Sequence, residues 1–197
     1  MLDLKKYIEE LRSKRPVFHS EADFQHALAW VIHEGNKEAK VRLEFPFDGN
    51  EGRQYLDILV SEGKEEYAIE LKYKTKKFYK EIGRDKFDLT NQSAHDWGCW
   101  GFCKDIERIR KFGGGFAVFL TNDKLYWTEP RGTGRPNYSA FKLFQGQELK
   151  GELEWINQNA KSLKNNMKRS VKVGGPYKLE WNDYSSYGFR YLLVNVM

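Results

Sequence analysis

Two apolar segments, each interrupted by charged residues, place the strongest constraint on how this chain can fold. The segments are YLDILV, residues 55–60, and EYAIELKYK, residues 66–74, and both have the aliphatic and aromatic composition of β-strands. The polar turn SEGKEE lies between them. This order predicts a hairpin or a short meander within a sheet.

The charged residues of the second segment are expected on one face of its strand. Side chains alternate across a strand, so Glu70 and Lys72 project from the same face, together with Ala68. The opposite face carries Ile69, Leu71 and Tyr73. The hairpin would bring Asp57, from the middle of the first segment, alongside Glu70.

Two carboxylates placed together within a strand pair cost free energy through desolvation and like-charge repulsion unless a cation lies between them. Asp57 and Glu70 offer the hard oxygen ligands that Mg²⁺ prefers, and Mn²⁺ can substitute. Such an ion polarises a phosphate group and stabilises the charge that develops when a phosphodiester is cut. Lys72 would orient or help to deprotonate an attacking water, or stabilise the transition state.

A simpler arrangement of the same residues is also open at this point. Asp57 and Lys72 can form a cross-strand ion pair while Glu70 points into solvent, because such pairs are common on exposed sheet faces.

Helices are expected on both sides of the strand pair. Residues 3–13 and 21–34 have helical periodicity; Ser20 is the expected N-cap of the second helix, with Glu21 in its first turn and Gly35 at its end. Residues 81–112 are mostly helical in period and are followed by three glycines. The other expected strands are residues 41–47, residues 116–123 with 124–130 as their hairpin partner, and residues 188–197.

The sequence resembles the PD-(D/E)XK nuclease superfamily, in which an Asp is followed after a gap by Glu or Asp, any residue, and Lys. Asp57, Glu70 and Lys72 match this motif, although Leu56 stands where the family usually has Pro. The resemblance implies that Asp57 and Glu70 bind Mg²⁺ and that Lys72 assists the nucleophilic water. It further implies that Glu21 joins the metal ligands and that Gln92, on the helix after the Lys strand, contacts DNA or the site.

The resemblance also implies a fold and an activity. The fold is α/β, with a mixed central sheet, flanking helices and a restriction-endonuclease-like αβββαβ core over about residues 20–127. Residues 128–197 would elaborate this core within a single domain of residues 1–197. The activity is that of a Mg²⁺-dependent DNA endonuclease of restriction, defence or repair type.

The charge distribution favours nucleic acid as the partner. The 197 residues carry a formal net charge of +5, and basic residues cluster after the predicted Glu70 strand. The residues expected to contact nucleic acid are Lys74, Lys76, Lys77, Arg131 and Arg135. A second basic cluster comprises Lys161, Lys164, Lys168, Arg169 and Lys172. Each cluster alone is also compatible with an ordinary solvated face.

Two other functions stay open from the sequence. One is a nucleic-acid-binding or assembly subunit that keeps the fold without catalysis, and the other is a nuclease acting on RNA or on a structured junction. A homodimer that cuts two strands is compatible with the family, but no segment indicates a dimer surface.

The N-terminal segment and the cysteines bear on location. The segment MLDLKKYIEELRSK mixes charged and apolar residues, unlike a signal peptide. Cys99 and Cys103 are four residues apart, a helical spacing that rarely closes a disulfide. We therefore expect reduced thiols, a cytoplasmic location and no association with membranes.

Overall fold

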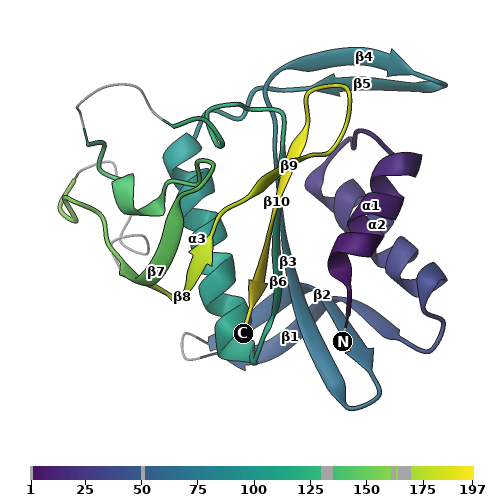
Figure 1. The fold of residues 1–197 in the computed structure, drawn as a ribbon, viewed down its shortest axis with the longest axis horizontal. Coiled ribbons are helices and arrows are strands. Elements are labelled where there is room, and N and C mark those ends of the chain that lie inside the picture. The colour runs from purple at the N-terminus through teal and green to yellow at the C-terminus, as the bar shows by residue number, and fades with distance from the viewer. Residues whose placement is uncertain (1, 50–51, 130–134, 161–162, 164–169) are drawn as a thin grey trace.

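The computed structural model describes residues 2–49, 52–129, 135–160, 163 and 170–197. A six-stranded mixed sheet lies between two layers (Figure 1). The α-helices are α1 (Leu4–Lys14), α2 (Glu21–Gly35) and α3 (His95–Phe112). The central sheet has the order β1 (Lys40–Gly49), β2 (Gly52–Glu62), β3 (Glu65–Lys74), β6 (Gly115–Thr121), β10 (Arg190–Val196) and β9 (Trp181–Asp183). The predicted α/β class with a mixed sheet and flanking helices is confirmed at this level.

Two small hairpins and a 3₁₀ turn complete the described secondary structure. They are β4 (Phe78–Ile82) with β5 (Asp85–Leu89), β7 (Glu148–Leu153) with β8 (Val171–Lys178), and η1 (Ser139–Phe141). The first hairpin projects beyond one end of the central sheet, and the second lies on the α3 side (Figure 1). Helix α3 therefore packs between two sheets.

The N-terminal helices form as the sequence predicts. The Ser20 hydroxyl accepts a hydrogen bond from Asp23 N at 3.1 Å, which satisfies one of the free N–H groups at the start of α2. Both oxygens of Asp23 accept from Arg15 at 2.8 Å and tie the two helices together. The cap at the far end of α2 is Asn36, directly after the predicted Gly35.

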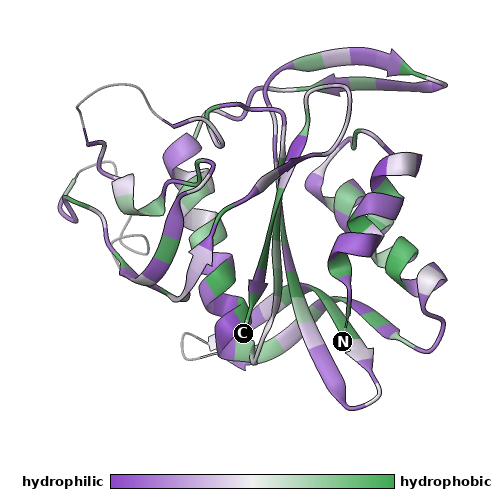
Figure 2. Ribbon diagram, in the orientation of Figure 1, coloured by the Kyte–Doolittle hydropathy of each residue, from purple (hydrophilic) through white to green (hydrophobic). Residues whose placement is uncertain are grey.

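The sheet separates two apolar cores. In Figure 2 the central strands are largely hydrophobic and therefore drawn green. One core lies under α1 and α2 and includes Ile8, Leu28 and Val60. The other lies under α3 and the β7–β8 hairpin and includes Phe102 and Val173. Because both faces of the central strands are covered, any charged residue within these strands must be buried or reach an edge of the sheet.

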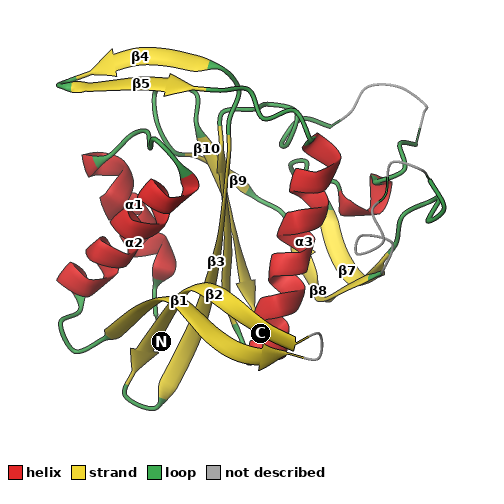
Figure 3. Ribbon diagram, turned by 180° about the vertical axis from the view of Figure 1, so that it is seen from behind, coloured by secondary structure: helices red, strands yellow, loops and turns green. Residues whose placement is uncertain are grey.

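The predicted β2–β3 hairpin is confirmed, and α3 makes the crossover that follows it. Strands β2 and β3 are antiparallel, whereas β3 and β6 are parallel. A parallel pair needs a long connection, and α3 supplies it by passing over one face of the sheet (Figure 3). Among the described residues, no helix has the length and apolar character needed to cross a bilayer.

The expectation of helix throughout residues 81–112 is wrong in its first part. The chain forms the β4–β5 hairpin there, with Gly83 at φ 62° in its turn, and α3 begins only at His95. Phe87 and Leu89 alternate inward toward the α1–α2 core, so burial selects the strand. Cys99 and Cys103 lie within α3 as free, buried thiols, as expected.

The expected hairpin between residues 116–123 and 124–130 is also wrong. Residues 124–127 form turns, and β6 instead pairs with β3 and β10. Asp123 starts the turn by accepting a hydrogen bond from Leu125 N at 3.1 Å. The predicted C-terminal strand thus takes the place beside β6, and the central sheet extends beyond the core expected at residues 20–127.

Candidate active site

Strand β3 presents an apolar face and a charged face. Ile69, Leu71 and Tyr73 are buried in the α1–α2 core. Ala68 belongs to the α3 core, and Glu70 and Lys72 follow it on that side at alternate positions. The prediction that Glu70 and Lys72 share one face is therefore confirmed, and only 1% of Glu70 is exposed.

Two carboxylates cap the edge of β3 where β2 leaves it. The pairing of β2 with β3 ends at Ile58 opposite Ile69, so the next β3 amides lack a strand partner on that side. Asp57 Oδ2 accepts from Leu71 N at 2.6 Å, and Glu21 Oε2 accepts from Tyr73 N at 2.7 Å. Buried amides require such partners, and here they hold Asp57 and Glu21 along the same strand.

A break in the alternation of β2 positions Asp57. Leu56 belongs to the α3 core and Ile58 to the α1–α2 core, although residues two apart in a regular strand share a face. Opposite this break, Glu44 of β1 has φ 50°, a rare conformation outside glycine. Gln25 of α2 bridges the two strands at this break: its side-chain amide donates to Asp57 O at 2.6 Å and to Glu44 Oε1 at 2.9 Å.

Helix α3 contributes two charged residues to this site. Arg108 Nη1 lies 2.5 Å from Glu70 Oε2 and 3.3 Å from Asp105 Oδ1. Lys72 Nζ lies 2.8 Å from Asp105 Oδ2. The simpler arrangement, an Asp57–Lys72 pair with Glu70 in solvent, is therefore wrong, because Glu70 is buried and both cations pair with other partners.

The electrostatics of the site follow from its burial. Burial raises the pKa of Asp57 to about 6, against the lowering effect of the Leu71 amide and Lys72. Burial, Asp105 and Asp57 together raise the pKa of Glu70 well above its usual value. Burial lowers the pKa of Lys72, but Asp105 and Glu21 outweigh it and hold the pKa above its usual range. Lys72 is thus a cation at neutral pH.

The donor set is suited to a divalent metal ion in chemistry and charge. Its four carboxylates are those of Glu21, Asp57, Glu70 and Asp105, and two cations, Lys72 and Arg108, leave a net charge of −2 when all are ionised. Glu70 Oε1 is buried and has no hydrogen-bond partner among the described residues. Hard carboxylate oxygens with unbalanced negative charge are typical ligands of Mg²⁺.

The arrangement is not a preformed metal cage. In the described part of the chain, no group of three or more His, Cys, Asp or Glu side chains converges closely enough to hold an ion as it stands. Arg108 and Lys72 already engage Glu70 and Asp105. A bound ion would use the unpartnered Glu70 Oε1 or compete with Arg108 for Glu70 Oε2.

Gln92 lies near Glu21 but not on a helix. It belongs to the loop between β5 and α3, where its N–H donates to Thr75 O at 2.8 Å, so the expected helical position is wrong. Gln92, Glu21 and Lys74 nevertheless line one cleft of about 270 Å³. A second cleft, of about 340 Å³, has Arg108 in its wall. The charged site thus borders solvent on two sides.

The basic residues expected to contact nucleic acid differ in their environments. Lys77 and Arg135 are exposed, and Lys74 is half-buried in the Glu21 cleft. Lys76 Nζ lies 3.5 Å from Asp123 Oδ2. Arg131 and most of the second basic cluster lie outside the described residues, namely Lys161, Lys164, Lys168 and Arg169.

Sequence reasoning missed Asp105, Arg108 and Gln25. The α3 stripe that includes Phe102, Ile106 and Ile109 predicts the buried side of the helix, and Asp105 and Arg108 flank it at a spacing of three residues. That spacing is a weak signal for a charged pair at the margin of a core. On α2, the polar Gln25 lies one turn after Glu21 and therefore on the same side of the helix, which is a similarly weak signal that it belongs to the site.

No protein-family model, curated protein or solved structure matches this chain. Any assignment of function therefore depends on the residues and geometry described above.

Proposed function

We propose that this chain is a metal-dependent phosphodiesterase, with DNA as the favoured substrate and a restriction-endonuclease-like arrangement of its core. One observation carries the proposal: Asp57 accepts a hydrogen bond from the β3 amide between Glu70 and Lys72, where β2 leaves the strand, and Glu70 has a buried oxygen without a hydrogen-bond partner among the described residues. Burying carboxylates in this way costs stability, which indicates a function other than folding.

Asp57, Glu70 and Glu21 are the residues that would hold Mg²⁺ or Mn²⁺. A bound ion supplies Lewis-acid polarisation of the phosphate and neutralises the charge that develops on its oxygens. The protein itself fixes Asp57 and Glu21 through the Leu71 and Tyr73 amides, so these two carboxylates need little reorganisation.

Lys72 acts as a cation in this proposal, not as a general base. Its raised pKa keeps the proton on Nζ at neutral pH. Asp105 anchors this ammonium group at 2.8 Å, and 20% of the Lys72 side chain is exposed. Lys72 therefore orients the attacking water or stabilises negative charge on the phosphate by donating hydrogen bonds.

Nucleic acid is favoured as the substrate because of the cations beside the site. Lys74 lines the cleft that contains Glu21, and Lys77 is exposed shortly after it on the same chain segment. Cations at these positions would neutralise backbone phosphates on either side of the one being cut. This charge does not distinguish DNA from RNA.

The test is cleavage of single-stranded, duplex and branched DNA and RNA, with Mg²⁺, with Mn²⁺ and with a chelator. We expect cleavage that requires the metal and falls by at least about 1000-fold in Asp57→Asn and Glu70→Gln, by analogy with the loss of charge stabilisation at other active sites. The matched control is Glu66→Gln, an exposed carboxylate four residues before Glu70 on β3. Full cleavage by the Asp57 and Glu70 variants would contradict the site.

The ion pairs of the site favour one other function. Arg108 and Lys72 form ion pairs with Glu70 and Asp105 without a metal, as expected of a protein that binds nucleic acid without cutting it. Salt-sensitive binding that is indifferent to metal and to the Glu70→Gln change would support that alternative.

A further inference from the structure

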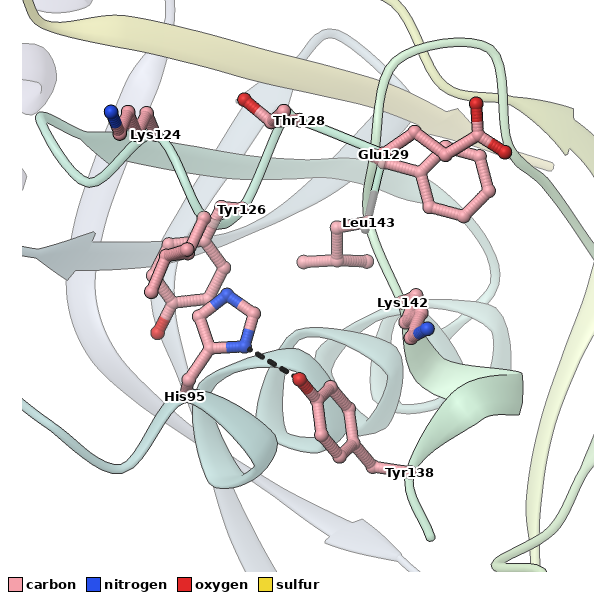
Figure 4. Close-up of a pocket in the computed structure, with 10 residues that line it drawn as sticks. His95, Lys124, Tyr126, Thr128, Glu129, Tyr138, Lys142 and Leu143 are labelled. Carbon is pink, nitrogen blue, oxygen red and sulfur yellow. Dashed lines mark hydrogen bonds between the residues drawn. The ribbon is translucent and has the colours of Figure 1, made fainter. Parts of the chain in front are cut away.

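A pocket of about 540 Å³ lies at the N-terminal end of α3, outside the candidate active site. Its walls combine four aromatic rings with two cations: His95, Tyr126, Tyr138, Phe144, Lys124 and Lys142. The volume falls within the range of small-ligand sites, which are mostly apolar with a few polar groups. Figure 4 shows the pocket between the ring of His95 and the side chains of Leu143 and Lys142.

The aromatic wall of this pocket is held in place. The His95 ring lies 4.1 Å from that of Tyr126, centroid to centroid, and tilts by 35°. Its Nδ1 lies 3.2 Å from the Tyr138 hydroxyl, so the ring is fixed from both sides (Figure 4). Burial lowers the pKa of His95, which leaves the imidazole neutral. A fixed, neutral aromatic surface is suited to stacking with a flat ligand.

The pocket lies close to Lys72 along α3. The Tyr126 hydroxyl packs against Gly98, where a Cβ atom would collide with it. Three residues on, a Cβ atom at Gly101 would lie 3.6 Å from Lys72 Cε. Since a helix rises ~1.5 Å per residue, His95 and Gly101 are separated by about 9 Å. This span corresponds to about two or three nucleotides of duplex rise.

Basic residues lie between the pocket and Lys72 of the candidate active site. Lys76 N donates to Asn122 Oδ1 at 2.7 Å, which holds the basic run after β3 beside the turn that carries Lys124. Lys124 and Lys142 line the pocket. The acidic groups nearby are Glu129 in the lining, and Asp96 and Asp123 close to His95; Asp123 is buried and pairs with Lys76. These acids leave little net positive charge in the pocket, so a phosphate alone has no strong partner there.

We infer that this pocket binds one unstacked nucleobase of the substrate strand, with the backbone running past the lysines toward Lys72. The inference rests on the proposed function, because that function supplies the nucleic acid. Stacking against aromatic side chains contributes about 1–3 kcal/mol per base and accepts any base, whereas hydrogen bonds to the edge of the base select among them. The Tyr138 hydroxyl, Thr128 and Lys142 offer such bonds.

The experiment measures binding of the four deoxynucleoside monophosphates, and of deoxyribose 5-phosphate, to the full chain in a chelator. Nuclear magnetic resonance follows the ring protons of His95 and Tyr126. We expect saturable shifts with at least one nucleotide and none with the sugar phosphate. His95→Ala should weaken the binding about tenfold or more, and Tyr138→Phe, which removes only a hydroxyl group, should weaken it less. The matched control is Trp30→Ala, an indole that is 65% exposed on α2, across the sheet from α3.

The outcomes separate the pocket from the catalytic proposal. Nucleotide binding that depends on His95, in a protein that cleaves no nucleic acid, would support base binding in the pocket and contradict the proposed nuclease activity. Nucleic-acid cleavage without any nucleotide-induced shift of these ring protons would contradict base binding in the pocket and remain consistent with the proposed nuclease activity. Equal binding by the sugar phosphate, or unchanged binding by both pocket variants, would also overturn it.

Discussion

The two faces of β3 are built from alternate residues of one strand, yet they meet different demands. Toward α1 and α2, Leu71 and Tyr73 pack into an apolar core, and the Tyr73 hydroxyl donates to Phe18 O at 2.8 Å. Toward α3, Glu70 and Lys72 are held by Arg108 and Asp105. The first face stabilises the fold by burying apolar area, whereas the second places like charges together at a cost. Substitutions on the two faces should therefore differ in kind.

The largest effect is expected from Lys72→Met, which keeps much of the side-chain volume but removes the charge. We expect phosphodiester cleavage to fall by about 100- to 10,000-fold, because the proposed water-orienting cation is lost. The midpoint of thermal unfolding should fall as well, because the buried Asp105 loses its ion pair with Lys72, so cleavage is compared at a temperature where the variant is folded. The control is Lys64→Met in the exposed β2–β3 turn. Cleavage at the wild-type rate would show that Lys72 contributes to stability and not to catalysis.

The apolar face should respond in the opposite way to Leu71→Ala. Leu71 is fully buried, and such a truncation typically costs about 2–5 kcal/mol of unfolding free energy. Urea denaturation measures this loss. At a temperature where the variant is folded, its cleavage should keep the metal requirement of the wild type. A loss of metal dependence in folded protein would mean that the two faces are not separable.

The charged face should become more stable when Asp57 is replaced by Asn. The raised pKa of about 6 means that the folded protein holds this proton more tightly than the unfolded chain, so the contribution favours folding at low pH and is lost as the pH rises through about 6. The charged groups near Asp57 are Lys72, Asp105, Glu21, Glu70 and Arg108. In a chelator at pH 8, Asp57→Asn should gain about 1–3 kcal/mol over the wild type.

Thermal unfolding at pH 5 and pH 8 measures this difference. The gain at pH 5 should be about half of that at pH 8, because the carboxyl of the unfolded chain, with a pKa of about 3.9, is already ionised at pH 5. A variant less stable than the wild type at pH 8 would show that the bond to Leu71 N outweighs the cost of burying the charge.

A smaller effect is expected at Arg108, which competes with a metal ion for Glu70. Removing the guanidinium in Arg108→Gln should raise the affinity for Mn²⁺ about tenfold, equivalent to about 1.4 kcal/mol. Calorimetric titration without nucleic acid measures the affinity, and Arg110→Gln on the same helix is the control. Unchanged or weaker binding of Mn²⁺ would contradict the exchange between Arg108 and the ion.

Several features of the fold and of the candidate site follow from local sequence. The N-cap of α2, the β2–β3 hairpin and the shared face of Glu70 and Lys72 depend on residues within a short stretch of the chain. The β4–β5 hairpin was not predicted, because its strands are short and polar: only Phe87 and Leu89 are buried in the core, and Phe78 and Ile82 pack against it while partly exposed. The pairing of β6 with the C-terminal β10 was also missed, because residues 124–130 follow β6 directly and were expected to form a hairpin with it.

The sequence by itself determined which residues carry charge within an apolar strand, because alternation is a property of the strand alone. The tertiary structure decided which partners those charges meet. Asp105 and Arg108 reach Glu70 and Lys72 only after α3 crosses the sheet, and Gln25 reaches Asp57 only where β1 and β2 break their regular pairing. Contacts between elements far apart in the chain depend on packing and topology, which no local pattern encodes.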